Sequence, residues 1–410
     1  MNLNTITKAI AGLTVILSGA FSYAGGCHLE DVTPAKELAS EYLANLVRDK
    51  VVEVEKSMNA KGQKLNAVFI ARRGESMSGL RIYKDDPNVA LQDYLQELTK
   101  AIHAISNSQD RDAATGTSGS NQMMDRLFTK NQLKYSHMGI LLKRNPAVPA
   151  DQQPKDDWVY ITHLLSECDK KSDRYGASDL FFQTLDQFFW DTKILSKKAY
   201  ANSAMVIVPI PEVQARIREI FDHREIFRTG LHTLQYNVAA VPFRLKGPSN
   251  RKGVAPQNYY QLKDQNSNQW PLEVLAAATK PVGQIFDRTT AQDQLMATNY
   301  RPSILRPVGL KESLACSLKK GPFWDATNLL NCNDQAFRSV GIVQLITVDS
   351  VVDYMVRNSL TAESVDVANQ PAIYEVTASA DVIAEKIKEA KIIEDLIKTA
   401  DQVEAEQNRH

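Results

Sequence analysis

The sequence predicts an α+β protein in which an antiparallel sheet packs against helices. Apolar stretches of strand length at 135–142 and 158–165 are separated by polar and proline-rich residues, a pattern typical of neighbouring antiparallel strands. Several other segments have helical periodicity, without the strict βαβ alternation of a parallel sheet. With 43% hydrophobic and 23% charged residues over 410 positions, the chain can bury a sizeable core.

Residues 1–24 have the pattern of a cleavable secretory signal. Lys8 is the only charged residue among the first 28, and an apolar run follows it at 9–21. Ser22 and Ala24 then place small side chains at the minus-three and minus-one positions, which signal peptidase requires. The run is too short to cross a bilayer, which takes about 20 residues, and no later stretch approaches that length. We expect a periplasmic or secreted protein that is not transmembrane after cleavage.

The cysteines fit an oxidising destination. Four are present, Cys27, Cys168, Cys316 and Cys332, and an even number in an exported chain predicts disulfides. Cys316 and Cys332 are close enough to close one loop, which leaves Cys27 with Cys168. The alternative for Cys27 is a lipid anchor, but Ala24 stands where a lipobox normally has a large aliphatic residue. No cysteine and histidine pair has metal-site spacing, so we expect neither a metal nor another cofactor.

The charge balance is close to neutral. The chain has 48 basic and 48 acidic side chains, and removal of residues 1–24 leaves 47 against 48. Such a balance provides no field to attract nucleic acid or an anionic membrane. The partner is therefore expected to be a small molecule or a component of the cell envelope, and not a nucleic acid.

In the first half of the chain, apolar residues recur at helical spacing over 34–59 and 91–105, and strands are predicted at 67–71, 135–142 and 158–165. The segment 107–122 is nearly devoid of large apolar side chains and predicts a mobile loop. A hairpin is the simplest arrangement of the strands at 135–142 and 158–165.

In the second half, an aromatic stripe within 179–190 is expected in the core because aromatic side chains commonly fill cores. Its members are Leu180, Phe181, Leu185, Phe188 and Phe189. Strands are predicted at 204–208, 235–243 and 341–347, and helices at 211–221, 267–278, 351–356 and from 380 onward. The last helix is expected to be a solvated surface helix, with a partner-binding or coiled-coil role as the alternative.

These elements predict four parts of the chain. They are a signal peptide at 1–24, an N-terminal helical segment at 25–66, an α+β domain at 67–360 with its mobile loop near 107–122, and a C-terminal helical extension at 361–410.

Five segments carry a family resemblance: ARRGESMS at 71–78, KYSHMGI at 134–140, WVYITHLL at 158–165, QNSNQWPLEVLAAA at 265–278 and ITVDSVVDYMV at 346–356. Through them the chain resembles the bacterial domain-of-unknown-function 2145 family over roughly residues 60–360. That family is in turn similar to circularly permuted papain-like proteins, in which a histidine on one strand and a polar partner on the next precede a cysteine at the start of a helix.

The resemblance implies a permuted papain-like core with a catalytic constellation. His137 matches the first position, His163 is the candidate for the second, and Ser267 falls where the cysteine would be. A nucleophile at a helix N-terminus would lie near unpaired N–H groups that stabilise an oxyanion. Because a serine hydroxyl has a much higher pKa than a thiol, Ser267 would need His137 as general base, held in its tautomer by His163, Asn266 or Gln269.

Each residue also has a structural interpretation. Ser267 is a good N-cap, His137 fits a satisfied core histidine, and the amides of Asn266, Asn268 and Gln269 fit groups that close backbone hydrogen bonds. Under a functional interpretation these amides, with Trp270 and Arg73, would bind a ligand, although Arg73 also fits a salt bridge or surface contact.

Two classes of function follow from these alternatives. The first is a hydrolase or acyltransferase acting on an amide or ester, with Ser267 as nucleophile and His137 as base. The second is a catalytically silent papain-like domain that binds a ligand or an envelope partner, because a resemblance in fold does not transfer activity.

Overall fold

The computed structural model describes residues 34–72, 81–83, 131–132, 135, 137–144, 157–166, 178–190, 203–223, 231, 235–236, 264–280, 287–305 and 343–407. The signal peptide, the four cysteines, the helix predicted at 91–105, the loop predicted at 107–122 and Arg73 lie outside these residues.

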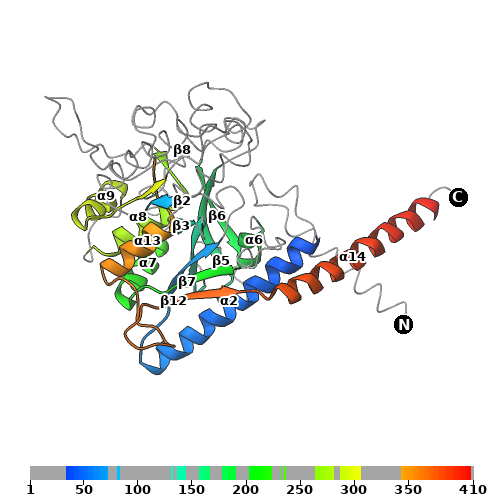
Figure 1. Cartoon of the computed structure of the whole chain (residues 1–410), viewed down its shortest axis with the longest axis horizontal. Helices are drawn as coiled ribbons and strands as arrows, with labels where there is room; N and C mark the ends of the chain where they lie inside the picture. Colours follow the sequence, from blue (N-terminus) through cyan, green and yellow to red (C-terminus); the bar gives the residue numbers. More distant parts are fainter. Residues whose placement is uncertain are drawn as a thin grey trace, which may run out of the picture.

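A six-stranded sheet is the centre of the fold, with the strand order β12-β7-β1-β4-β5-β6 (Figure 1). The strands are β1 (Ala67–Arg72), β4 (His137–Leu142), β5 (Tyr160–Ser166), β6 (Ser178–Thr184), β7 (Ser203–Ile207) and β12 (Ile373–Thr377). Every neighbouring pair is antiparallel. The predicted α+β class with an antiparallel sheet is confirmed, as is the pairing of the two strands predicted as a hairpin.

One face of this sheet is covered by α2 (Pro34–Ala60) and α6 (Leu185–Phe189), while α14 (Ala380–Gln407) packs against α2 and runs outward from the sheet (Figure 1). In α2, Leu43, Val47, Val51 and Val54 recur every three or four residues and are buried, so one stripe of the helix faces the sheet. They pack with Val68 and other residues of the same core cluster. The helix predicted at 34–59 is thereby confirmed.

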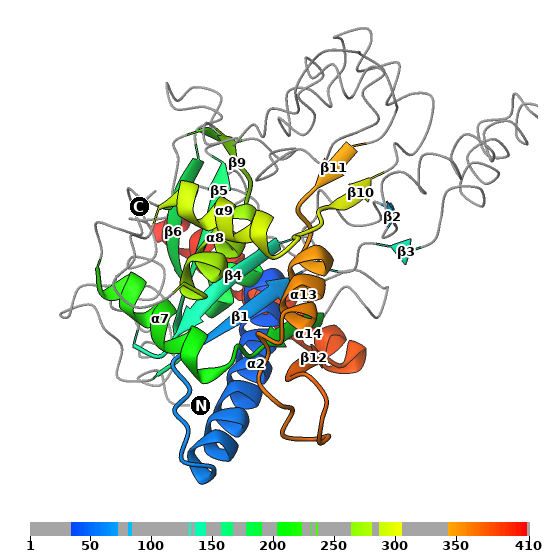
Figure 2. The ribbon, with the colours of Figure 1, turned by 90° about the vertical axis from the view of Figure 1, so that its left-hand side faces the viewer.

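The opposite face carries α7 (Pro211–Asp222), α8 (Gln269–Ala278), α9 (Arg288–Ala297) and α13 (Val348–Arg357) (Figure 2). Pro211 occupies the first turn of α7, where a missing N–H costs nothing. Thr347 and Ser350 form a reciprocal capping box at the start of α13. Every residue of α8 is buried, so this helix lies in the middle of the second core cluster.

Two small sheets complete the described structure. One has the order β11-β10-β2-β3, and the other pairs β8 with β9 in parallel. Their strands are β2 (Arg81–Tyr83), β3 (Asn131–Gln132), β8 (Gln235–Tyr236), β9 (Asp264–Gln265), β10 (Ser303–Leu305) and β11 (Val343–Leu345).

The aromatic stripe at 179–190 lies in the core, as predicted, but two elements share it. Phe181 is on β6, whereas Leu185, Phe188 and Phe189 belong to α6. Thr184 starts α6 through its capping box with Gln187, which is why the strand changes to helix at this residue.

Candidate functional site

Strand alternation places His137 and His163 on the face of the sheet that α2 and α6 cover. Met138 and Ile140, the alternate residues of β4, point to the α8 face and belong to its core cluster. Because β4 and β5 pair Ile140 with Thr162, the next position along the register sets Gly139 opposite His163. His137 therefore reaches the His163 ring diagonally across Gly139.

Gly139 is required by this close approach. A Cβ at this position would lie 2.8 Å from Cγ1 and Cδ1 of Ile161 and 3.1 Å from the carbonyl oxygen of Thr162. Such distances are shorter than van der Waals contacts between heavy atoms, which lie near 3.5–4.0 Å. Glycine thus leaves the space in which the side chains of β4 and β5 meet.

A chain of hydrogen bonds runs from β4 across β5 to β6. Nε2 of His137 lies 2.8 Å from Nδ1 of His163, and Nε2 of His163 lies 2.8 Å from Oε1 of Gln183. Their residue exposures are 5%, 0% and 8% in that order, so water barely reaches this chain. We refer to these three residues as the histidine chain.

Aromatic rings and a cation surround the histidine chain. The ring of Phe188 in α6 lies 5.6 Å from that of His137 and 5.0 Å from that of His163. Arg72 of β1 pairs in register with His137, and its guanidinium lies 5.0 Å from the centre of the Phe188 ring. The pKa of His137 is lowered well below its ordinary value. Burial is the largest cause, followed by the positive charge of Arg72 and then by His163. His137 is therefore neutral at neutral pH and can accept a proton.

The segment around Ser267 precedes α8. Oδ1 of Asn266 accepts hydrogen bonds from the backbone N–H of Asn268 at 2.9 Å and of Gln269 at 2.7 Å. Asn266 therefore performs the capping role that the sequence suggested for Ser267. Ser267 itself is 9% exposed.

Ser267 and His137 are held by different layers of the protein. The α8 helix packs on one face of the sheet, whereas the His137 ring contacts Phe188 on the other. In the part of the chain that the structure describes, the hydrogen-bond partner of the His137 ring is His163.

The amides next to Ser267 have partners of their own. Nδ2 of Asn268 donates to the carbonyl oxygen of Ile346 at 3.2 Å, and Nε2 of Gln269 donates to Glu273 at 2.8 Å. The Trp270 ring is fully buried and packs edge-on against Phe221 of α7, with 6.2 Å between ring centroids. Of the groups suggested as partners of His137, the structure thus selects His163.

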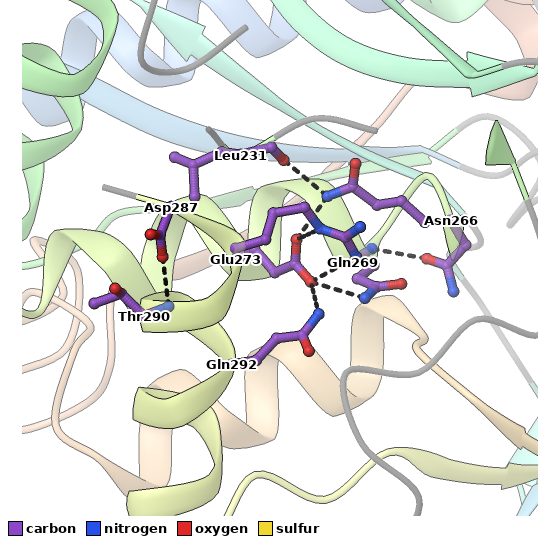
Figure 3. Close-up of polar contacts among 9 residues, drawn as sticks. Leu231, Asn266, Gln269, Glu273, Asp287, Thr290 and Gln292 are labelled. Atoms are coloured by element: carbon purple, nitrogen blue, oxygen red, sulfur yellow. Dashed lines mark hydrogen bonds and ion pairs between the residues drawn. The ribbon is translucent and has the colours of Figure 1, made fainter. Parts of the chain in front are cut away.

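Glu273 is the centre of a second buried polar group, the Glu273 cluster (Figure 3). Its carboxylate accepts from Nε and Nη2 of Arg288 at 2.7 and 3.1 Å. It also accepts from the amides of Gln265, Gln269 and Gln292 at 2.7, 2.8 and 2.8 Å. The cluster joins β9, α8 and α9, because each element contributes at least one of these side chains.

Four of the five motifs, all except the segment at 71–78, overlap a family match. The model of the family described as "Uncharacterized protein conserved in bacteria (DUF2145)" matches residues 119–249 and 255–355, which is more than half of the chain. This chain belongs to the DUF2145 family. No curated protein and no solved structure matches this DUF2145 protein significantly. The match contains the histidine chain, Ser267 and the Glu273 cluster.

Two parts of this DUF2145 site were not identified from sequence. Gln183 lies in the aromatic segment at 178–184, and no spacing rule connects it with His163 until the β5–β6 register is known. Arg72 ends a buried strand beside Arg73, and only the register with β4 shows that Arg72 faces His137.

Within the described residues of the DUF2145 protein, no group of three or more histidine, cysteine, aspartate or glutamate side chains is arranged to hold a metal ion. In the same residues, no helix is long and apolar enough to cross a membrane.

Proposed function

We propose that this protein is an envelope hydrolase or acyltransferase that acts on an amide or ester, with His137 as general base. The observation that carries this proposal is the contact between His137 and His163, whose ring nitrogens lie 2.8 Å apart. A base oriented by a second polar group is the arrangement that activates a weak nucleophile. The lowered pKa keeps His137 neutral at neutral pH but also makes it a weaker base, so the proposal rests on the geometry of the contact and not on this pKa.

Ser267 is the proposed nucleophile. His137 would take the hydroxyl proton while Oγ forms a bond to the substrate carbonyl carbon, giving a tetrahedral intermediate. Collapse would break the bond to the amine or alcohol, which leaves with the proton from His137. A water molecule, deprotonated in the same way, would then release the acid. The order of His137 on β4, His163 on β5 and Ser267 before α8 is that of a permuted papain-like core, which we propose for this domain.

The positive charge of Arg72 would favour the negative charge that develops on the carbonyl oxygen. The helix start is a weaker candidate for this role, because Asn266 already accepts from the backbone N–H groups of residues 268 and 269. We therefore propose the Arg72 guanidinium as the group that stabilises the oxyanion.

A fluorophosphonate probe tests this function directly. It forms a bond between phosphorus and the activated serine oxygen and expels fluoride, and intact mass spectrometry measures the adduct. We expect a single adduct on Ser267, none in Ser267→Ala, and labelling at least about 100-fold slower in His137→Gln, the lower end of a general base's contribution. Ser350→Ala, which alters a serine in the capping box of α13, is the matched control. Equal labelling of the wild type and Ser267→Ala would contradict the proposal.

The alternative is a catalytically silent domain that binds a ligand or an envelope partner. The capping of the α8 start by Asn266 favours it, because those N–H groups then have no oxyanion to stabilise. Isothermal titration with soluble peptidoglycan fragments tests it. Binding by both the wild type and Ser267→Ala, without probe labelling of either, would favour this function over hydrolysis.

The envelope location rests on the signal pattern of residues 1–24. Intact mass of the protein recovered from the periplasm or the medium tests it. Cleavage after Ala24, leaving Gly25 as the first residue, is the expected result. A periplasmic mass that includes residues 1–24, or lipid on Cys27, would contradict it.

A further inference from the structure

Gln183 is the last member of the histidine chain. It lies on β6, pairs in register with Ile161, and therefore extends toward the same face of the sheet as His163. The 2.8 Å contact joins Nε2 of His163 to Oε1 of Gln183, which is an oxygen and can only accept.

The acceptor at Gln183 determines where both rings carry their protons. With Oε1 as acceptor, Nε2 of His163 must carry a hydrogen, so Nδ1 of neutral His163 has a lone pair. That lone pair can only accept, and Nε2 of His137, at 2.8 Å, must be the donor. His137 consequently keeps its own lone pair on Nδ1, the nitrogen outside the chain.

We propose that Gln183 is a positioning residue that fixes the tautomers of His163 and His137 and so directs the basic nitrogen of His137 away from the sheet interior. Gln183 does not touch the reacting atoms in this scheme. It acts through His163, and the burial of all three residues protects the pattern from exchange with water. The positioning role rests on the proposed function of His137 as a base, whereas the tautomers exist without any substrate.

The opposite pattern is the alternative that Gln183 excludes. If Nδ1 of His163 carried the hydrogen, it would donate to Nε2 of His137, and the lone pair of His137 would face the chain and be lost to a substrate. Nε2 of His163 would then carry a lone pair and no hydrogen, and it would face Oε1 of Gln183. Two acceptors would therefore lie next to each other in a buried site. The observed orientation of the Gln183 amide, with Oε1 toward His163, is therefore compatible with one tautomer pair.

The tautomers are measured by ¹⁵N NMR of the histidine rings in the full-length protein, at alkaline pH where both rings are neutral. Single His137→Gln and His163→Gln variants assign the signals. We expect the wild type to carry hydrogen on Nε2 of both rings. Wild-type His163 protonated on Nδ1 would overturn the proposal without any reference to catalysis.

Three variants complete the test. Gln183→Leu removes the acceptor, and we expect the hydrogens of both rings to move from Nε2 to Nδ1. Gln183→Glu keeps an acceptor and is expected to keep the wild-type pattern, so it also guards against misfolding of the leucine variant. The exposed Gln370→Leu is the matched control and should change neither ring. Unchanged tautomers in a folded Gln183→Leu protein would refute the role of Gln183, while probe labelling of Ser267 would separately decide the proposed function.

Discussion

The two buried polar groups on opposite faces of the sheet differ in how their central side chains are hydrogen-bonded. In the Glu273 cluster, one carboxylate accepts five hydrogen bonds from four side chains, and its negative charge is matched by Arg288. The histidine chain is linear and ends at Gln183, and its proposed tautomers leave a lone pair on Nδ1 of His137. A carboxylate whose oxygens all accept hydrogen bonds connects secondary structure elements, whereas a ring nitrogen that keeps a lone pair can still take part in chemistry.

Loss of the cation from the Glu273 cluster should have the largest effect. Arg288→Ala leaves a fully buried carboxylate without its counter-charge, and the free energy of unfolding should fall by about 3–5 kcal/mol. Urea denaturation measures this change, and Arg301→Ala, at an exposed position, should stay within about 0.5 kcal/mol of the wild type.

A second substitution, at Glu273, tests whether the loss of stability comes from the unpaired buried charge. The double variant Glu273→Leu with Arg288→Met removes the buried charge but also removes the acceptor of the Gln265, Gln269 and Gln292 amides, so it should recover only part of the lost stability. If the single Arg288→Ala variant were as stable as the wild type, the Glu273 cluster would not be a structural connection.

Gly139→Ala tests the geometry of the histidine chain. The new Cβ meets Ile161 at 2.8 Å, and relief of this overlap must move β5 relative to β4. We expect the free energy of unfolding to fall by about 1–3 kcal/mol, as for other overpacked cores. Combining Gly139→Ala with Ile161→Ala should cost less than the sum of the two single changes. Additive costs would show that Ile161 is not the obstacle.

The pH dependence of stability tests the environment of His137. Its folded-state pKa is lowered from the ordinary 6.5, so below that pH the unfolded chain takes up a proton that the folded protein does not. Stability should therefore fall as pH decreases from about 6.5 toward the folded-state value, at a slope of up to about 1.4 kcal/mol per pH unit for this one proton.

His137→Gln keeps a donor for His163 but does not titrate, so the urea-derived slope between about pH 6.5 and 5 should decrease by that contribution. His223→Gln, at an exposed position after α7, should keep the wild-type slope. Equal slopes in His137→Gln and the wild type would mean that His137 takes up its proton at the same pH in the folded and unfolded chains.

The smallest effect is expected at the start of α8, which supports Gln269 and Glu273. Asn266→Ala removes the acceptor for two backbone N–H groups and should cost about 1 kcal/mol. Asn266→Asp keeps an acceptor and should cost less. Equal costs in thermal or urea unfolding would show that packing, and not the cap, holds this turn.

The sequence predicted the elements whose signals are local. Periodicity identified α2, α7 and the long final helix, and alternating apolar runs identified β1, β4, β5 and β7. The short strands β2, β3, β10 and β12 were not predicted, because two to five residues paired with distant partners carry little local pattern. The helix α9 was missed for a related reason, since Arg288 and Gln292 on its buried side are polar.

The candidate site was predictable only in part. The contact of His137 with His163 follows from two adjacent strands and was one of three alternatives that the sequence offered, beside Asn266 and Gln269. Gln183, Arg72 and the use of Asn266 as cap depend on strand register and on competing side chains, which no spacing along the chain reveals. The relation of Ser267 to His137 stays a prediction.

The position of β1 and β12 in the sheet determines when this protein can finish folding during synthesis. The family match starts at residue 119 and ends at 355, yet β1 lies in the middle of the sheet and β12 at its edge beside β7. A nascent chain that has reached residue 355 therefore still exposes the backbone groups of β7, an edge that invites pairing with other chains. The strand that covers β7 emerges only with residues 373–377, and from then on the exposed backbone groups at this edge of the sheet belong to β12.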